Sequence, residues 1–158
     1  MRKIFPVIFI ISIALLIPGI SCTKESCDQD TDVFMNAGFY SVQAEEEEED
    51  EKISIDSLDI YALNVPDSLI YSMVTLDQVS LPLNPAATSC GFVMVNGGRA
   101  DTVEIFYSSR LQLLSMACGY IYFHEIEEIR HTGNDINYIT IINKSVNPGE
   151  QENIQIFF

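Results

Sequence analysis

The sequence has no tryptophan, only two histidines, and only 8 basic residues against 23 acidic ones. Nucleic-acid binding needs a basic face that displaces counterions from phosphates, so a net charge of −15 argues against that class of protein. GxSxG, P-loop, GxGxxG and CxxC motifs are also missing. These are the usual signals of nucleophilic hydrolysis, nucleotide binding and structural zinc. We therefore expect no enzymatic activity, no metal and no cofactor.

The N-terminus is the only long apolar run. Met1–Lys3 is basic, and Ile4–Ile20 is almost wholly apolar until Gly19-Ile20-Ser21-Cys22. A basic start, an apolar centre and small residues at the end are typical of a secretory signal. Pro18-Gly19 breaks the run too early for a permanent transmembrane helix. We predict that residues 1–21 are a removable signal peptide, which leaves a mature charge of −17.

Two cleavage chemistries fit this signal. The small residues Gly19 and Ser21 suit general signal peptidase, whereas Cys22 after Ser21 resembles a bacterial lipobox. The usual lipobox leucine is replaced by Gly19, a relaxed form that resembles those of Bacteroidota lipoproteins. We favour lipidation of Cys22, because two or three acyl chains anchor a protein stably. The alternative is a secreted protein with Cys22 in a disulfide.

Domain organisation follows from these assignments. Residues 22–32 are a polar, acidic lipidated tether, and residues 33–158 form a single domain with an acidic loop at 44–52. We expect the protein in the cell envelope, on the outer membrane. Thr23-Lys24-Glu25 partly resembles a surface-export signal but lacks a second adjacent acid, so the face of the membrane stays open.

Short β-type runs follow one another from Val33 onward, with no helical apolar stripe of three turns. The sequence predicts an antiparallel β-sandwich, immunoglobulin-like or a related Greek key, with about 8–10 strands. Asn96-Gly97-Gly98 predicts a tight hairpin turn. Glu125–Arg130 is the one window that fits a short helical turn. The candidate strands are Phe34–Val42, Ile53–Ile55, Leu58–Leu63, Leu69–Val74, Val79–Leu83, Phe92–Asn96, Thr102–Ser108, Leu111–Ser115, Gly119–Ile126, Asn137–Asn143 and Ile154–Phe158.

Alternation places Tyr120, Tyr122 and His124 on one face of a strand. We predict that this face is half of the sandwich core, because alternating aromatic strands usually pack inward. The alternative is an exposed aromatic strip for a glycan or a protein partner. His131 lies seven residues after His124, which on a regular strand puts the two on opposite faces and argues against a shared metal.

Two acidic segments raise the question of calcium. Asp28–Asp32 has the alternating carboxylates of an EF-hand loop, but Val33 and Phe39 stand where the loop needs Gly and Glu. Glu45–Glu51 holds seven adjacent carboxylates, which repel one another and form no cage without other ligands. We predict an acidic tether and a solvated loop.

Cysteine usage is consistent with an oxidising compartment. If Cys22 carries lipid, three thiols remain and one of them stays without a partner in the chain. A Cys27–Cys118 bond would tie the mature N-terminus to a late strand, and a Cys90–Cys118 bond would join two strands across the core. Spacing alone does not choose between them.

Several motifs together resemble a known family. They are the lipobox with the nearby Cys27, Leu58-Asp59-Ile60-Tyr61, Asp67-Ser68-Leu69-Ile70-Tyr71, Leu81-Pro82-Leu83-Asn84-Pro85, Asp101-Thr102-Val103-Glu104-Ile105, Cys118-Gly119 and the apolar C-terminus. The set is similar to a family of small Bacteroidota lipoproteins classed only as a domain of unknown function. The resemblance implies a Cys27–Cys118 disulfide and a spare Cys90, and it implies no activity.

The expected function is that of a lipid-anchored, non-enzymatic accessory or interaction subunit of the outer membrane. It would be held to the membrane by its N-terminal lipid, with an outer-membrane protein as partner and without nucleic acid. The alternative is a surface carbohydrate- or calcium-binding module.

Overall fold

The described residues of the computed structural model are 26–42, 51–65, 67–149 and 151–158. They form ten strands and no helix, so they contain no helix able to cross a membrane. The strands are β1 (Phe34–Tyr40), β2 (Ile55–Ala62), β3 (Leu69–Leu76), β4 (Gln78–Pro82), β5 (Ser89–Asn96), β6 (Arg99–Ser115), β7 (Gly119–His131), β8 (Tyr138–Ile141), β9 (Ser145–Val146) and β10 (Glu152–Phe157).

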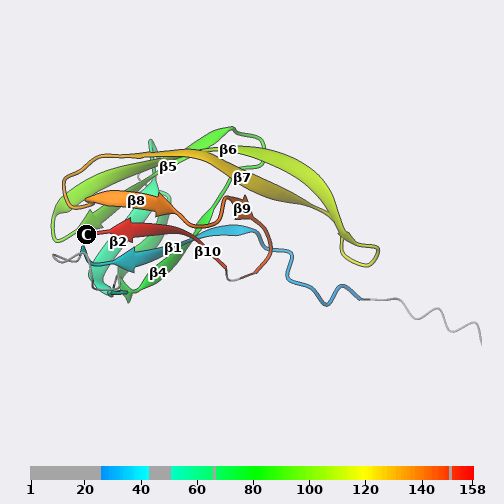
Figure 1. Ribbon diagram of the computed structural model, residues 1–158, viewed down its shortest axis with the longest axis horizontal. Coiled ribbons are helices and arrows are strands. Elements are labelled where there is room, and N and C mark those ends of the chain that lie inside the picture. Colours follow the sequence, from blue (N-terminus) through cyan, green and yellow to red (C-terminus); the bar gives the residue numbers. More distant parts are fainter. Residues whose placement is uncertain (1–25, 43–50, 66, 150) are drawn as a thin grey trace, which may run out of the picture.

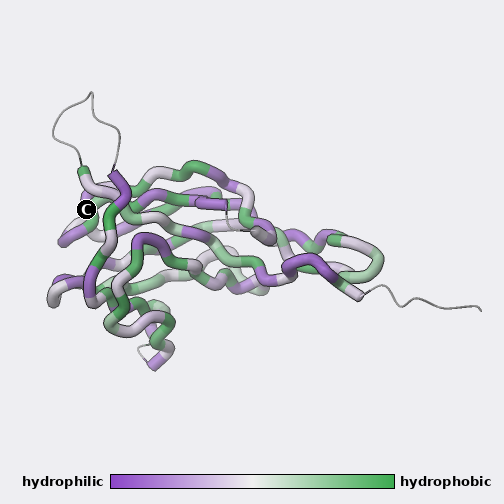
Figure 2. Tube along the Cα trace, turned by 90° about the horizontal axis from the view of Figure 1, so that it is seen from below, coloured by the Kyte–Doolittle hydropathy of each residue, from purple (hydrophilic) through white to green (hydrophobic). Residues whose placement is uncertain are grey.

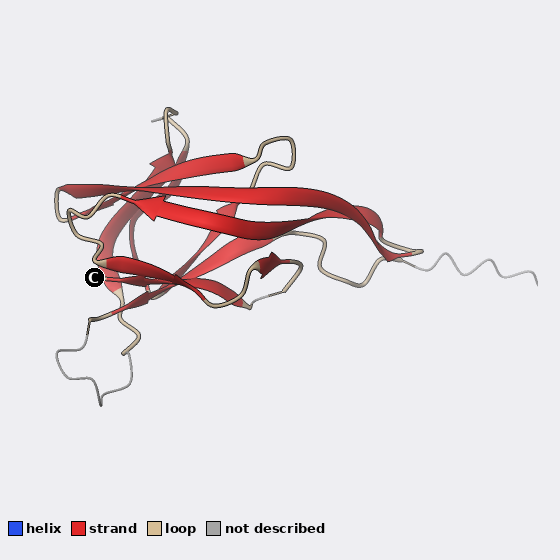
Figure 3. Ribbon diagram, turned by 45° about the horizontal axis from the view of Figure 1, so that its top comes forward, coloured by secondary structure: helices blue, strands red, loops and turns tan. Residues whose placement is uncertain are grey.

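Two sheets pack face to face, which confirms the predicted all-β sandwich (Figures 1 and 3). One sheet has the order β4-β1-β10-β8 and the other the order β3-β2-β5-β6-β7-β9. Their inner faces supply one continuous apolar core, as alternating strands require. The largest fully buried side chains include those of Met35, Phe39, Leu58, Ile60, Leu81, Ile105, Tyr107, Ile126, Ile154 and Ile156.

The sheets are not wholly antiparallel as predicted, because β1 and β10 pair in parallel at the centre of the smaller sheet. The first and last strands therefore lie side by side. A register shift between Asn36 and Ala37 interrupts this pair. Asn36 donates its backbone N–H to the side-chain oxygen of Asn153 at 3.0 Å, and both side chains are buried. The two amides satisfy backbone groups that the irregular ladder leaves open.

Several predicted strands merge. The two runs between Thr102 and Ser115 belong to one 17-residue strand, β6, and the predicted helical turn at Glu125–Arg130 lies within β7. The helical prediction was wrong because pairing with β6 continues through this segment as far as His131. The hairpin at Asn96-Gly97-Gly98 is confirmed, with φ of 56° and 84° at the two glycines.

Candidate functional site

The β6–β7 hairpin is longer than the sandwich that supports it. Pairing of β5 with β6 ends at Phe106, and pairing of β9 with β7 is confined to His124 and Glu125. Residues 108–123, here called the arm, therefore form a two-stranded ribbon whose outer edges pair with no third strand among the described residues. The arm projects from one end of the molecule, opposite to the C-terminus (Figures 1 and 2).

One face of the arm carries exposed apolar side chains. Leu111 pairs with Tyr122, and Leu113 pairs with Tyr120, so the four side chains share one face. They are 43–66% exposed, and Met116 at the turn is 88% exposed. The prediction that Tyr120 and Tyr122 lie in the core was wrong, because the hairpin extends past the sheet that would cover them. His124, predicted on the same face, is buried where the arm meets the body.

A disulfide between Cys27 and Cys118 holds the tip of the arm, with 4.6 Å between the Cα atoms. This is the pairing that the family resemblance implies. Residues 26–33 leave the start of β1 and run toward the arm tip (Figure 1). An isolated two-stranded hairpin is only marginally stable in water, so this covalent link supports an arm that has little packing of its own.

The base of the arm contains a serine–histidine pair. Ser109 Oγ lies 2.8 Å from Nδ1 of His124, and the ring packs edge-on against Tyr107. Burial lowers the pKa of His124, so the imidazole is neutral near pH 7. A catalytic serine also needs a carboxylate that orients its histidine. No described carboxylate hydrogen-bonds His124. The pair therefore satisfies a buried imidazole and lacks the third member of a triad.

The structure places His124 and His131 on the same side of the sheet, contrary to prediction. They pair with Ser109 and Val103, which are six residues apart on β6. Glu127 is the extra residue of a β-bulge, and it shifts the alternation by one. Six residues still separate the two sites by about 20 Å, so they share no metal. Groups of three potential metal ligands are absent from the described part of the chain.

Asp101 is the most deeply buried carboxylate among the described residues, at 2% exposure. Its two oxygens accept hydrogen bonds from the Thr132 hydroxyl and from the backbone amides of Asn134, Asp135 and Ile136, at 2.6–3.0 Å. Burial alone would raise the pKa of Asp101, but these four hydrogen bonds together lower it. Both carboxylate oxygens accept hydrogen bonds from residues 132–136, at the end of β7 and in the loop that follows it, so the role of this carboxylate is structural.

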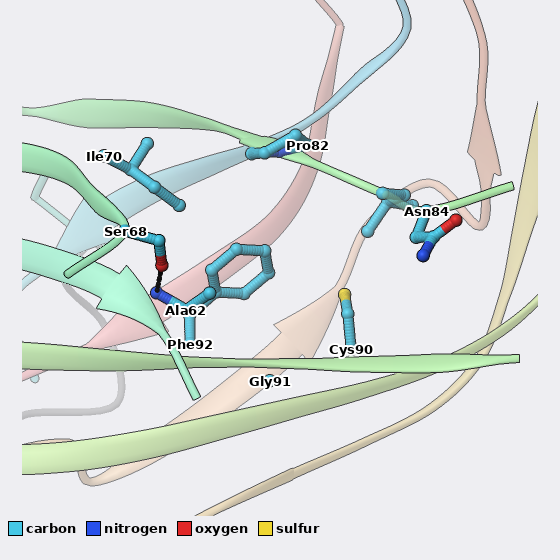
Figure 4. Close-up of a pocket in the computed structure, with 9 residues that line it drawn as sticks. Ala62, Ser68, Ile70, Pro82, Asn84, Cys90, Gly91 and Phe92 are labelled. Atoms are coloured by element: carbon cyan, nitrogen blue, oxygen red, sulfur yellow. Dashed lines mark hydrogen bonds between the residues drawn. The ribbon is translucent and has the colours of Figure 1, made fainter. Parts of the chain in front are cut away.

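An apolar cleft of about 360 Å³ opens where the turn before β3, the end of β4 and the start of β5 meet (Figure 4). Its walls include Ile70, Pro82, Leu83 and Phe92, and the thiol of Cys90 points into it. No charged residue lines the cleft. It is therefore a hydrophobic depression without an acid, base or activated nucleophile.

Cys90, the free cysteine among the described residues, should be chemically inert. Burial raises the pKa of the Cys90 thiol to about 11, and the neighbouring Tyr107 acts in the opposite direction. At pH 8, about one thiol in 1,000 would be ionised, against about one in four for an ordinary thiol. We expect alkylation by iodoacetamide about 200-fold slower in the native protein than in guanidinium, measured by intact mass. Equal rates in the two conditions would contradict a buried thiol.

The remaining predicted sites lie in the tether or outside the described residues. Asp28, Asp30 and Asp32 are exposed, and Asp30 accepts a hydrogen bond from the Asp32 amide, as in a local turn. Cys22 lies outside the described residues. So does the acidic run Glu45–Glu51, apart from the exposed Glu51.

Sequence reasoning missed Asp101, Ser109 and the Cys90 cleft. The Ser109–His124 contact depends on the register of a hairpin. The groups that donate hydrogen bonds to Asp101 lie more than 30 residues after it in the sequence. The alternation of apolar and polar residues predicts neither contact. Both could be predicted only if the pairing of the strands were already known.

Comparison with known proteins adds one match. Residues 57–158 match the family of unknown function DUF6452. The match runs from within β2 to the C-terminus, and it includes Cys90, Asp101 and the whole arm but leaves out β1 and Cys27. No curated protein and no solved structure matches the chain. Because the match covers well over half of the sequence, the chain belongs to the DUF6452 family of unknown function.

Proposed function

We propose that this protein is a lipid-anchored, non-enzymatic interaction subunit of the outer membrane, similar to the small lipoproteins of Bacteroidota that its sequence resembles. The observation that carries the proposal is the Cys27–Cys118 disulfide. Cys27 follows the lipobox cysteine, Cys22, by only five residues. An anchor at Cys22 would therefore hold the molecule by its arm, and the sandwich body would project away from the attachment point.

The distribution of charge supports this orientation. There is no acidic residue between Glu104 and Glu125, although the chain has 23 acids. The end of the body opposite the arm carries Glu51, Asp77 and Asp135, close to the ends of β1 and β10. Lys52 pairs with Asp77 and Arg99 pairs with Asp135, which leaves Glu51 without an ion pair there among the described residues. The arm, which carries no acid of its own, would face the membrane surface with Asp28 of the tether beside its turn. The opposite end of the body would be presented to a partner.

The chemistry of the buried groups supports a binding role over a catalytic one. Asp101 has its oxygens occupied, and Cys90 stays protonated near neutral pH. The Ser109–His124 pair has no orienting carboxylate among the described residues. We expect the partner to be an integral protein of the same membrane, because a short tether restricts the body to that surface.

Lipidation is tested by mass spectrometry of the mature protein purified from its membrane. We expect an N-terminus that begins at Cys22 and carries acyl chains, and we expect a Cys22→Ala variant to keep its signal peptide. An unmodified Cys22 in the mature protein would rule out the anchor.

Crosslinking in intact cells, followed by purification, tests the interaction. The expected result is a crosslinked membrane protein that is lost when an exposed acid at the far end is neutralised, for example in Glu51→Gln. Recovery of the monomer alone would count against a partner role. Protease treatment of whole cells shows which face of the membrane carries the domain.

Carbohydrate binding is the second candidate, because Tyr120 and Tyr122 lie exposed on one face and could stack on a sugar ring. Binding on a glycan array that disappears in Tyr122→Ala would favour it, since an accessory subunit should bind none. A melting temperature unchanged by millimolar calcium would remove the calcium form of this alternative.

A further inference from the structure

The arm ends in a surface that is unusual for an acidic protein. Met116 is 88% exposed, Tyr120 is 66% exposed and Leu111 is 56% exposed, while Leu113 and Tyr122 complete the same face. Arg110 is the single formally charged side chain within the arm. Large apolar side chains grouped on a projecting element mark a contact surface. We infer that the arm docks on the lipid surface that holds the anchor.

Chain length limits what the arm can reach. This inference rests on the proposed lipidation of Cys22, five residues before the disulfide-bonded Cys27. Five residues span at most about 18 Å when fully extended. The arm tip is therefore tied within that distance of the acyl chains, whereas the rest of the body is separated from them by the length of the arm. A membrane is the one partner that the tether keeps permanently within reach of Met116.

The composition of the arm fits the headgroup zone of a bilayer. Tyrosine places an apolar ring and a polar hydroxyl at such a boundary, as Tyr120 and Tyr122 would do. The arm itself carries no acid and Arg110 adds one positive charge, but Asp28 of the tether lies beside the Met116 turn. The contact therefore depends on the apolar side chains of the arm and not on charge attraction. A sheet edge or protein groove as the occupant would not explain why the apolar cluster lies at the end nearest the anchor.

The depth of contact is limited by the backbone. Both outer edges of the arm have backbone groups without a strand partner among the described residues, and such edges are not tolerated in hydrocarbon. Asp28, Asp30 and Asp32 in the neighbouring tether also resist burial. The arm should therefore lie in the hydrated interface and place only Met116, Leu113 and the tyrosine rings among the upper methylenes.

Because the chain has no tryptophan, one introduced tryptophan reports on one position. We would reconstitute the full lipidated protein into phosphatidylcholine vesicles brominated in the upper part of the acyl chains. Tyr120→Trp places the reporter on the arm, and Tyr138→Trp places it at the start of β8, at the opposite end near the C-terminus (Figure 1). We expect bromine to quench about half of the arm fluorescence, because interfacial elements lie about 5–10 Å into the headgroup and acyl boundary. The Tyr138→Trp signal should not change.

A matched pair of charge substitutions tests the contact itself. Met116→Glu, in the Tyr120→Trp background, should abolish quenching while the lipid still holds the protein on vesicles in a flotation gradient. Met73→Glu is the control, because Met73 is 72% exposed on β3, at the opposite edge of the larger sheet from β7. It should leave quenching unchanged. Both sites are exposed, so the fold should survive, which circular dichroism would verify.

The outcomes separate this inference from the proposed function. A floating protein with no quenching at position 120, or with equal quenching at 120 and 138, would overturn arm docking and leave the anchor intact. Protein that fails to float, together with an unmodified Cys22, would overturn both.

Discussion

Replacing Asp101 with asparagine is expected to lower the free energy of unfolding by about 3 kcal/mol, because breaking a buried network of charge-assisted hydrogen bonds leaves donors without an acceptor. Asp101 accepts four hydrogen bonds from Thr132 and the loop after it. An asparagine keeps one acceptor oxygen, but its NH₂ group would replace the other oxygen. That NH₂ group would face backbone N–H groups, which are also donors, so no hydrogen bond could form between them. Equilibrium unfolding in guanidinium would measure the loss.

Asp56→Asn is the matched control for this substitution. Asp56 is exposed and accepts a single hydrogen bond, from Thr75. The same change there should alter stability by no more than about 0.5 kcal/mol. If the Asp101→Asn variant were as stable as the control, the carboxylate would not be organising its loop.

The pH dependence of stability follows from the same group. The pKa of Asp101 in the folded protein lies below its ordinary value, so its contribution is fully present above about pH 4. It is lost as the pH falls through the folded-state pKa, because the carboxyl must then be protonated in both states. The difference between wild type and Asp101→Asn should therefore shrink as the pH is lowered below 4.

Removing the Cys27–Cys118 disulfide is expected to cost about 2 kcal/mol of stability. A bond with a sequence separation of 91 constrains the unfolded chain by about 4.6 kcal/mol in the chain-entropy model. Part of this is offset in the folded state, because the bond also fixes the short tether between Cys27 and Val33. For a tether of about seven residues the same formula gives an entropic cost of about 2.4 kcal/mol in the folded state. Subtracting this cost from the effect on the unfolded chain gives the expected loss of about 2 kcal/mol in the free energy of unfolding.

Hydrogen exchange would show where that loss falls. A Cys27→Ser, Cys118→Ser variant should lose amide protection in the arm, residues 108–123, and retain it in the sandwich strands. Cys90→Ala keeps the bond and serves as the control for loss of a sulfur atom. Unchanged arm protection in the double variant would show that the ribbon stands without its tether.

The class of fold could be predicted from the sequence, because alternation reports directly which side chains face a core. In the run Thr102–Ser108, alternation puts Val103, Ile105 and Tyr107 on one face of a strand, and all three are buried. Alternation does not report where the opposing sheet ends, so Tyr120 and Tyr122 carried the same pattern and were assigned to the same core. The arm is exposed because β6 and β7 extend beyond the strands that pair with them, β5 and β9.

Alternation along the sequence could not predict which residues from different strands come into contact. A single extra residue at Glu127 reversed the expected faces of His124 and His131, and no local pattern marks a bulge. The partners of Asp101 and Ser109 are set by hairpin register, which depends on the whole sheet. The disulfide pairing, in turn, was suggested only by the family resemblance, since spacing left Cys90 and Cys27 equivalent.

The parallel pairing of β1 with β10 has a consequence for the order in which the protein can be completed. β10 ends one residue before the end of the chain, yet it lies between β1 and β8 in the smaller sheet. β1 can pair with β4 on one side, but its other edge has no partner until a strand more than 110 positions away joins it. Closing so long a loop is slow. A chain that lacks β10 could thus form the larger sheet, but it would leave one edge of β1 unpaired and the core without the buried side chains of Ile154 and Ile156.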